Sequence, residues 1–153
     1  MLRRLTILTL LAMGVAVPAA AQTRIGIRAG ASGDPDQFVF GMHVDTPPLI
    51  EHLTFRPNVE VGIGDNVTLV ALNIEFAYWV PIRNSRWQVY FPAGPAANIY
   101  SFDRPPGRGS DTTVEGGFNL GVGIQHGRGL FTELKVGVID SPDIKVVVGY
   151  VFR

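Results

Sequence analysis

The segment VTLVALNIEFAYWV, Val67–Val80, alternates between two kinds of side chain. One set of alternate positions is apolar throughout and consists of Val70, Leu72, Ile74, Phe76, Tyr78 and Val80. The positions between them include Asn73 and Glu75. Because successive side chains of a β-strand point to opposite faces of the sheet, this period of two predicts a long strand with one wholly apolar face.

The same alternation runs from Thr23 to the C-terminus. It predicts eight strands, over residues 23–31, 37–45, 53–63, 67–80, 86–100, 112–126, 129–139 and 143–152. The connections between them are rich in Gly, Pro, Asp, Asn and Ser, the residues that turns select. No helical periodicity is visible in this region, so the pattern predicts an all-β domain.

The face opposite the apolar one collects the charged residues of the strands. Five are basic and five acidic: Arg24, Arg28, Arg56, Lys135, Lys145, Asp45, Glu60, Glu75, Glu115 and Glu133. Many glycines share this face, as do Asn58 and Asn73. An eight-stranded barrel has room inside for little more than its own filling side chains, so the large apolar residues would overfill it. The apolar face is therefore expected to meet lipid, with glycines and paired charges in a narrow lumen.

These features together predict a closed antiparallel up-and-down transmembrane β-barrel of about eight strands. A tilted membrane-crossing strand needs about 9–11 residues, which the predicted strands supply. Closure also removes the exposed edges that an open sheet of such apolar strands would present.

Balanced charge inside the barrel predicts a plugged lumen. Ionisable side chains in a narrow interior must be paired, and equal signs make pairing possible, whereas a selective pore would show a surplus of one sign. The predicted lumen charge network consists of Arg24, Arg28, Arg56, Glu60, Glu75, Glu115, Glu133, Lys135 and Lys145.

Aromatic residues gather toward the ends of several predicted strands. They are Tyr78, Trp79, Trp87, Tyr100, Phe102, Tyr150 and Phe152. Interfacial girdles of a membrane barrel place aromatic residues at these positions, so all seven are predicted to lie at the membrane interface.

The N-terminus predicts export. MLRR gives a basic start, Leu5–Val17 is apolar, and Ala19 and Ala21 occupy the small-residue positions of a cleavage site. We expect residues 1–21 to be a signal peptide and residues 22–153 to form one barrel domain. No later apolar stretch reaches 18 residues, so no transmembrane helix is predicted after the signal.

Four segments carry a resemblance to a known group of proteins. They are FRPNVEVGIGDNVTLVALNIEFAYWVPI (55–82), VYFPAGPAANIYSF (89–102), GGFNLGVGIQHGRGLFTELKVGV (116–138) and VVVGYVF (146–152). The chain resembles the small eight-stranded outer-membrane β-barrel proteins of Gram-negative bacteria. The resemblance implies a location in the bacterial outer membrane, with outer-membrane lipid and, during biogenesis, the barrel-assembly machinery as partners. Phe152 nearly fills the place of the terminal aromatic residue of such families, but Arg153 follows it.

Catalytic, cofactor and metal sites are not predicted. The chain has no cysteine, and His43, His52 and His126 are widely separated without a metal-ligand spacing. Some eight-stranded outer-membrane proteins are lipid A-modifying enzymes that use His and Ser, but this sequence shows no compact His/Ser/acid motif. Without Arg3 and Arg4 the chain has 11 basic and 13 acidic residues, which gives no electrostatic case for nucleic acid.

The function predicted from these observations is that of a non-enzymatic integral outer-membrane protein with a structural or surface-interaction role. SFDRPPGRGSD (101–111) is the longest predicted extracellular segment. The alternative is a secreted soluble β-barrel that binds a small apolar ligand, in which Phe, Tyr and Trp would line the cavity.

Overall fold

The computed structural model describes residues 23–102 and 111–152. The strands are β1 (Arg24–Gly33), β2 (Gln37–Asp45), β3 (Pro48–Ile50), β4 (Leu53–Ile63), β5 (Val67–Pro81), β6 (Trp87–Phe102), β7 (Asp111–His126), β8 (Leu130–Ile139) and β9 (Ile144–Val151). Eight of them are the strands expected from the alternation, each within two residues at either end. The exception is β3, which lies in a segment expected to be a connection. The expected signal peptide and most of the SFDRPPGRGSD segment lie outside the described residues.

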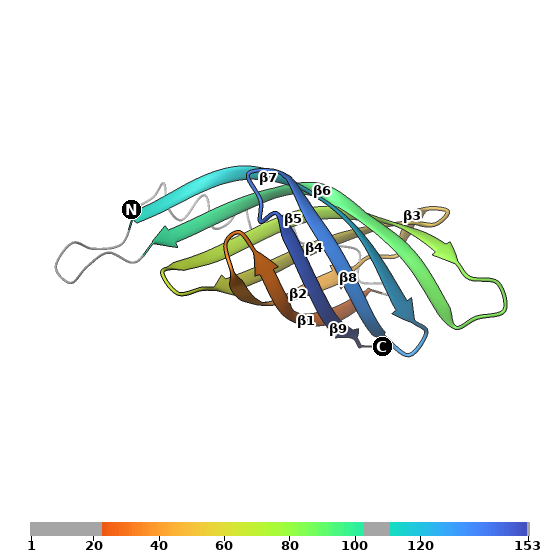
Figure 1. Cartoon of the computed structure of the whole chain (residues 1–153). Helices are drawn as coiled ribbons and strands as arrows, with labels where there is room; N and C mark the ends of the chain where they lie inside the picture. Colours follow the sequence, from red (N-terminus) through yellow and green to blue (C-terminus); the bar gives the residue numbers. More distant parts are fainter. Residues whose placement is uncertain (1–22, 103–110, 153) are drawn as a thin grey trace.

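The eight long strands form a closed antiparallel barrel. Neighbours along the chain are paired from β4 to β9, β9 pairs with β1, β1 with β2, and β2 with β4, which closes the circle. The three-residue β3 pairs only with β4, at one end. Figure 1 shows the strands wrapped side by side around a common interior. Each long strand described here pairs with a neighbour on both sides, which satisfies the backbone of a sheet in lipid.

The two ends of the barrel differ, and we name them by the segments that form them. The terminal rim contains the start of β1, the end of β9 and the connections 46–52, 82–86 and 127–129. It lies toward the right in Figure 1, where the C-terminus is marked. The loop rim contains the connections 34–36, 64–66 and 140–143.

The apolar face of the sheet lies on the outside of the barrel. Exposed large apolar side chains occur on every long strand and include Phe38 (71% exposed), Ile74 (53%) and Leu134 (39%). The alternate positions on the same strands are buried, as for Glu75 beside Ile74 and Glu133 beside Leu134. The expectation of an apolar exterior and a charged interior is confirmed. No helix within the described residues is long and apolar enough to cross a membrane.

Glycine permits close approach between strands at the inner wall. A Cβ atom added to Gly94 on β6 would overlap the backbone of Ile74 and Glu75 on β5. Because backbone atoms cannot move aside as a flexible side chain can, this position requires glycine. Other inward glycines make room for large inward side chains, as Gly26 does for His43 and Gly123 for Tyr90.

Candidate functional site

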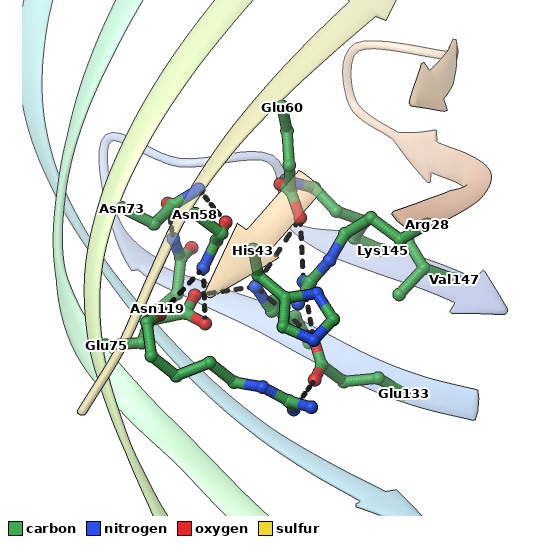
Figure 2. A network of polar contacts seen from close by, with 12 residues as sticks. Arg28, His43, Asn58, Glu60, Asn73, Glu75, Asn119, Glu133, Lys145 and Val147 are labelled. Atoms are coloured by element: carbon green, nitrogen blue, oxygen red, sulfur yellow. Dashed lines mark hydrogen bonds and ion pairs between the residues drawn. The ribbon is translucent and has the colours of Figure 1, made fainter. Parts of the chain in front are cut away.

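The centre of the barrel holds a compact group of buried charges, which we call the ionic cluster. Its members are four cations, Arg28, Arg56, Lys135 and Lys145, and four carboxylates, Asp45, Glu60, Glu75 and Glu133. Each is at most 3% exposed. They come from β1, β2, β4, β5, β8 and β9, so the cluster ties together strands that are far apart in sequence. Figure 2 shows several of these side chains converging in the interior.

Two glutamates are the main acceptors. Glu60 accepts from Arg28 Nη1 at 3.1 Å and from Lys145 Nζ at 2.5 Å. Glu133 accepts from Arg28 Nη1 at 3.1 Å and from Arg56 Nη1 at 3.3 Å. Since these charges have left water, their stability depends on this pairing and on hydrogen bonds that satisfy the remaining polar atoms.

Two further contacts complete the pairing. Lys135 Nζ bonds to Glu75 Oε1 at 2.6 Å, and Arg56 Nε bonds to Asp45 Oδ1 at 2.7 Å. Lys135 also lies 3.3 Å from Glu133 and 3.6 Å from Glu60. Four positive and four negative charges therefore balance within one connected group.

A chain of asparagines extends the polar contacts from the cluster. Asn58 Nδ2 donates to Glu75 Oε2 at 2.8 Å, and Asn73 Nδ2 donates to Asn58 Oδ1 at 2.7 Å. Asn119 Nδ2 donates in turn to Asn73 Oδ1 at 3.0 Å. These contacts carry the network across the lumen from β4 and β5 to β7 (Figure 2).

An aromatic layer covers the cluster on the side of the terminal rim. Tyr90 lies with its ring centroid 4.5 Å from the Arg56 guanidinium, and its hydroxyl donates to Glu133 at 2.7 Å. Trp79 packs against Tyr90 with centroids 4.7 Å apart, and its Nε1 donates to Thr54 Oγ1 at 2.9 Å. The layer therefore fills the lumen while it holds Arg56 by cation–π contact and orients Glu133.

His43 is buried beside the ionic cluster. Neither ring nitrogen has a hydrogen-bond partner among the described residues, and Asp45 Oδ1 lies 3.9 Å from Nε2. The ring packs edge-on against Phe131 at 5.3 Å. Space for it comes from Gly26 on the neighbouring strand, where an added Cβ would overlap the imidazole.

The structure brings together seven of the nine residues predicted for the lumen charge network. Arg24 lies at the terminal rim with its side chain 37% exposed, 3.6 Å from Asp45. Glu115 is half-buried opposite Asn98 and, within the described residues, has no ion pair with the cluster. Asp45 was placed on the charged face by the alternation but left out of the predicted network. It is a full member.

The aromatic prediction is wrong for two of its seven residues. Trp79 and Tyr100 are each 8% exposed and point into the barrel. On β5, Trp79 lies on the same inward face as Glu75 and Ala77. On β6, Tyr100 lies on the same inward face as Asn98. The other five lie outside: Tyr78, Trp87, Phe102, Tyr150 and Phe152. Proximity to a strand end suggested the interface, but parity along the strand decides which way a side chain points.

In the described part of the chain, no metal centre accompanies the cluster. Within residues 23–102 and 111–152, no three His, Asp or Glu side chains are placed to hold a metal ion. The carboxylates face cations at close range, and the space around them is filled by aromatic and amide side chains. The paired charges link strands on opposite sides of the barrel interior.

Comparison with known proteins supports the fold. No protein-family model and no curated protein matches the chain. Solved structures do match. The N-terminal β-barrel domain of Pseudomonas aeruginosa OprF has a TM-score of 0.61 and 13% identity, covering 86% of this chain and 100% of that one. The chain has the fold of a small eight-stranded outer-membrane β-barrel.

Two further barrels show the same likeness. Neisserial surface protein A has a TM-score of 0.61 and 12% identity, covering 85% of this chain and 96% of that one. The outer membrane enzyme PagL has a TM-score of 0.53 and 12% identity, covering 84% and 98%. At such low identity the likeness concerns the fold alone, so function must be argued from this barrel's own residues.

Proposed function

We propose that the chain is an integral protein of the bacterial outer membrane with a plugged lumen and a structural or surface-interaction role rather than a catalytic one. The observation that carries the proposal is the ionic cluster, in which four buried cations and four buried carboxylates pair across the barrel. Such a cluster stabilises the wall from inside while it occupies the route that an ion would take.

The filling of the lumen supports the absence of a steady pore. Inward of the terminal rim, the interior holds the Trp79–Tyr90 layer and then the ionic cluster, with the asparagine chain beside it. An eight-stranded barrel has little spare width, and these side chains occupy it. An ion would have to displace paired charges, which is costly because each would be left unpaired in a buried site.

The outer surface supports a location in a membrane. Apolar side chains that are roughly half exposed surround the barrel, among them Ile27, Phe91 and Val146. A soluble protein rarely exposes a continuous apolar surface of this extent. The soluble alternative required Phe, Tyr and Trp around an apolar cavity, whereas the centre of this barrel is charged.

The histidines support a non-catalytic role. Within the described part of the chain, no serine hydroxyl is hydrogen bonded to a histidine ring. Ser85 Oγ accepts from the Trp87 backbone N–H at 3.1 Å, and His126 Nδ1 accepts from the Arg128 backbone N–H at 3.2 Å. A hydrolase needs a nucleophile and a base within reach of each other. PagL is an outer-membrane enzyme with a similar fold, so this part of the proposal rests on side chains alone.

Planar-bilayer recording tests the plugged lumen. The purified protein is expected to give no steady, ion-selective conductance, while a 16-stranded porin inserted under the same conditions serves as the positive control. Insertion is verified by the difference in electrophoretic mobility between unheated and boiled samples. Reproducible open channels with a strong cation or anion preference would contradict the proposal.

Mass spectrometry tests the non-catalytic role. Lipid A and phospholipids extracted from cells that express the protein are expected to have the same masses as those from cells that do not. A new species lacking or gaining an acyl chain, dependent on the protein, would show that the barrel is an enzyme.

A further inference from the structure

The terminal rim contains a polar hollow that the ionic cluster does not use. We call it the arginine vestibule and define it by Arg24, Arg86, Gln88, Gln125, His126 and Arg128. Its volume is about 580 Å³, and a second hollow of about 790 Å³ shares Arg24 and Gln88 with it. The mouth of the barrel is therefore open at this rim above the aromatic layer.

Two adjacent turns place the arginines of the vestibule. Arg86 precedes β6 and Arg128 lies in the turn between β7 and β8, and β6 pairs directly with β7. The Gly127 backbone N–H donates to the Arg86 carbonyl oxygen at 2.7 Å, which ties the two turns together. Gly129 completes the second turn with a φ of +108°, a conformation that favours glycine. The fold thus holds two guanidinium-bearing residues side by side.

Positive charge in the vestibule is poorly compensated. Its lining includes three arginines and no carboxylate. Arg24 contacts Asp45 at 3.6 Å, but that carboxylate is buried and is already bonded to Arg56 at 2.7 Å. Within the described residues, Arg86 and Arg128 have no ion-pair partner, although the structure is rich in ion pairs elsewhere.

The remaining polar side chains can complete an anion site. Because His126 Nδ1 accepts the Arg128 backbone N–H, a neutral imidazole here carries its proton on Nε2, which is then a donor. The ring is held by Trp87, with centroids 4.8 Å apart. Gln88 adds an amide donor at the same mouth. These guanidinium, imidazole and amide groups are hydrogen-bond donors, so the vestibule suits a ligand whose polar atoms are all acceptors.

We propose that the arginine vestibule binds a phosphate-type anion, either a phospholipid headgroup or a free phosphoanion. Guanidinium groups present paired donors that match phosphate oxygens in a bidentate arrangement. Three of them suit a multivalent oxyanion better than a single carboxylate. The anion site does not depend on a plugged lumen, so the experiment on one proposal can fail while the other proposal holds.

Titration of inorganic pyrophosphate tests the site. The full-length chain is expressed, purified from membranes in a nonionic detergent and studied by isothermal titration calorimetry at constant ionic strength with chloride as the background anion. We expect saturable binding to the wild type. The double variant Arg86→Gln, Arg128→Gln is expected to raise the Kd at least about tenfold, because it removes two charge-assisted contacts.

Arg83→Gln is the matched control. Arg83 is exposed in the same turn as Arg86 but does not line the vestibule. Arg83→Gln lowers the net charge of the rim without changing the vestibule. The Kd for pyrophosphate is therefore expected to stay within about twofold of the wild-type value. The mobility of unheated samples verifies that each variant is folded. Equal effects of the double variant and Arg83→Gln on the Kd would overturn the proposal.

Native mass spectrometry distinguishes the two sources of phosphate. If a headgroup occupies the site, the wild type and Arg83→Gln will retain phosphatidylglycerol added to the detergent, and the double variant will lose it. If a free phosphoanion is the ligand, pyrophosphate will bind in the calorimeter with no lipid retained by any variant. Absence of both signals, or lipid retention that the double variant does not reduce, would contradict the site.

Discussion

A charge placed on the outer wall should cost stability in proportion to its depth in the membrane. Leu134 lies in the middle of β8 and points outward, between the buried Glu133 and Lys135. We therefore expect Leu134→Arg to place a guanidinium in lipid near the midplane. An arginine at that depth of a barrel costs about 2–4 kcal/mol.

The same strand offers a shallower site for comparison. Leu130 also points outward and lies four residues away, at the terminal rim. At about 3.4 Å per residue this is about 14 Å along the strand. With a strand tilt of about 45° it becomes about 10 Å of depth. Because the apolar band is about 25 Å tall, Leu130 lies near its edge, where arginine should cost about 0–1 kcal/mol.

Equilibrium unfolding in urea provides the measurement. The wild type, Leu134→Arg, Leu130→Arg and Leu134→Ala are folded into lipid vesicles, and the folded fraction is followed by tryptophan fluorescence and by electrophoretic mobility without heating. Leu134→Ala controls for the loss of the leucine side chain without added charge. The free energy of unfolding should decrease most for Leu134→Arg.

Two results would refute this reasoning. Equal costs for arginine at positions 130 and 134 would show that the outer wall does not experience a gradient of depth. A wild type that folds to a stable monomer in buffer without detergent or lipid would show that the apolar exterior does not require a membrane.

Three further outcomes are expected. Glu133→Gln should lower the free energy of unfolding in vesicles by about 3–5 kcal/mol, because Glu133 is the shared partner of buried cations; a loss below about 1 kcal/mol would mean that the cluster does not stabilise the barrel. Gly94→Ala should cost about 1–3 kcal/mol by overpacking against the β5 backbone, whereas Gly116→Ala, with open space around its added Cβ, should cost little; equal losses would contradict the packing argument. N-terminal sequencing of the exported protein should begin at Gln22, and retention of Met1 on most molecules would refute cleavage.

Seven of the eight members of the ionic cluster were predicted from the sequence, but their partners were not. Alternation assigns Glu60, Glu133 and Arg56 to one face, because the side-chain period of a strand is two. Their pairing depends on which strands meet across the lumen. Glu133 and Arg56 are 77 residues apart, and only closure of the barrel brings them within 3.3 Å. The same rule, applied at strand ends, assigns Trp79 and Tyr100 to the interior.

The arginine vestibule had no signal in the sequence. Arg86 and Arg128 lie in separate polar turns, which are typical surface positions. Their proximity follows from the pairing of β6 with β7 and from the backbone bond between Gly127 and Arg86. A turn sequence predicts local geometry, whereas a shared rim depends on the order of strands in the sheet.

The sequence by itself determined the strands, the faces and the class of fold, because each follows from local alternation and from the volume available inside a narrow barrel. Tertiary structure decided the contacts across the lumen, the inclusion of Asp45, the burial of His43 and the convergence of arginines at the terminal rim. The physical reason is that alternation states only which side of the wall a side chain occupies. Its neighbours across the interior are set by register and closure, which are properties of the whole barrel.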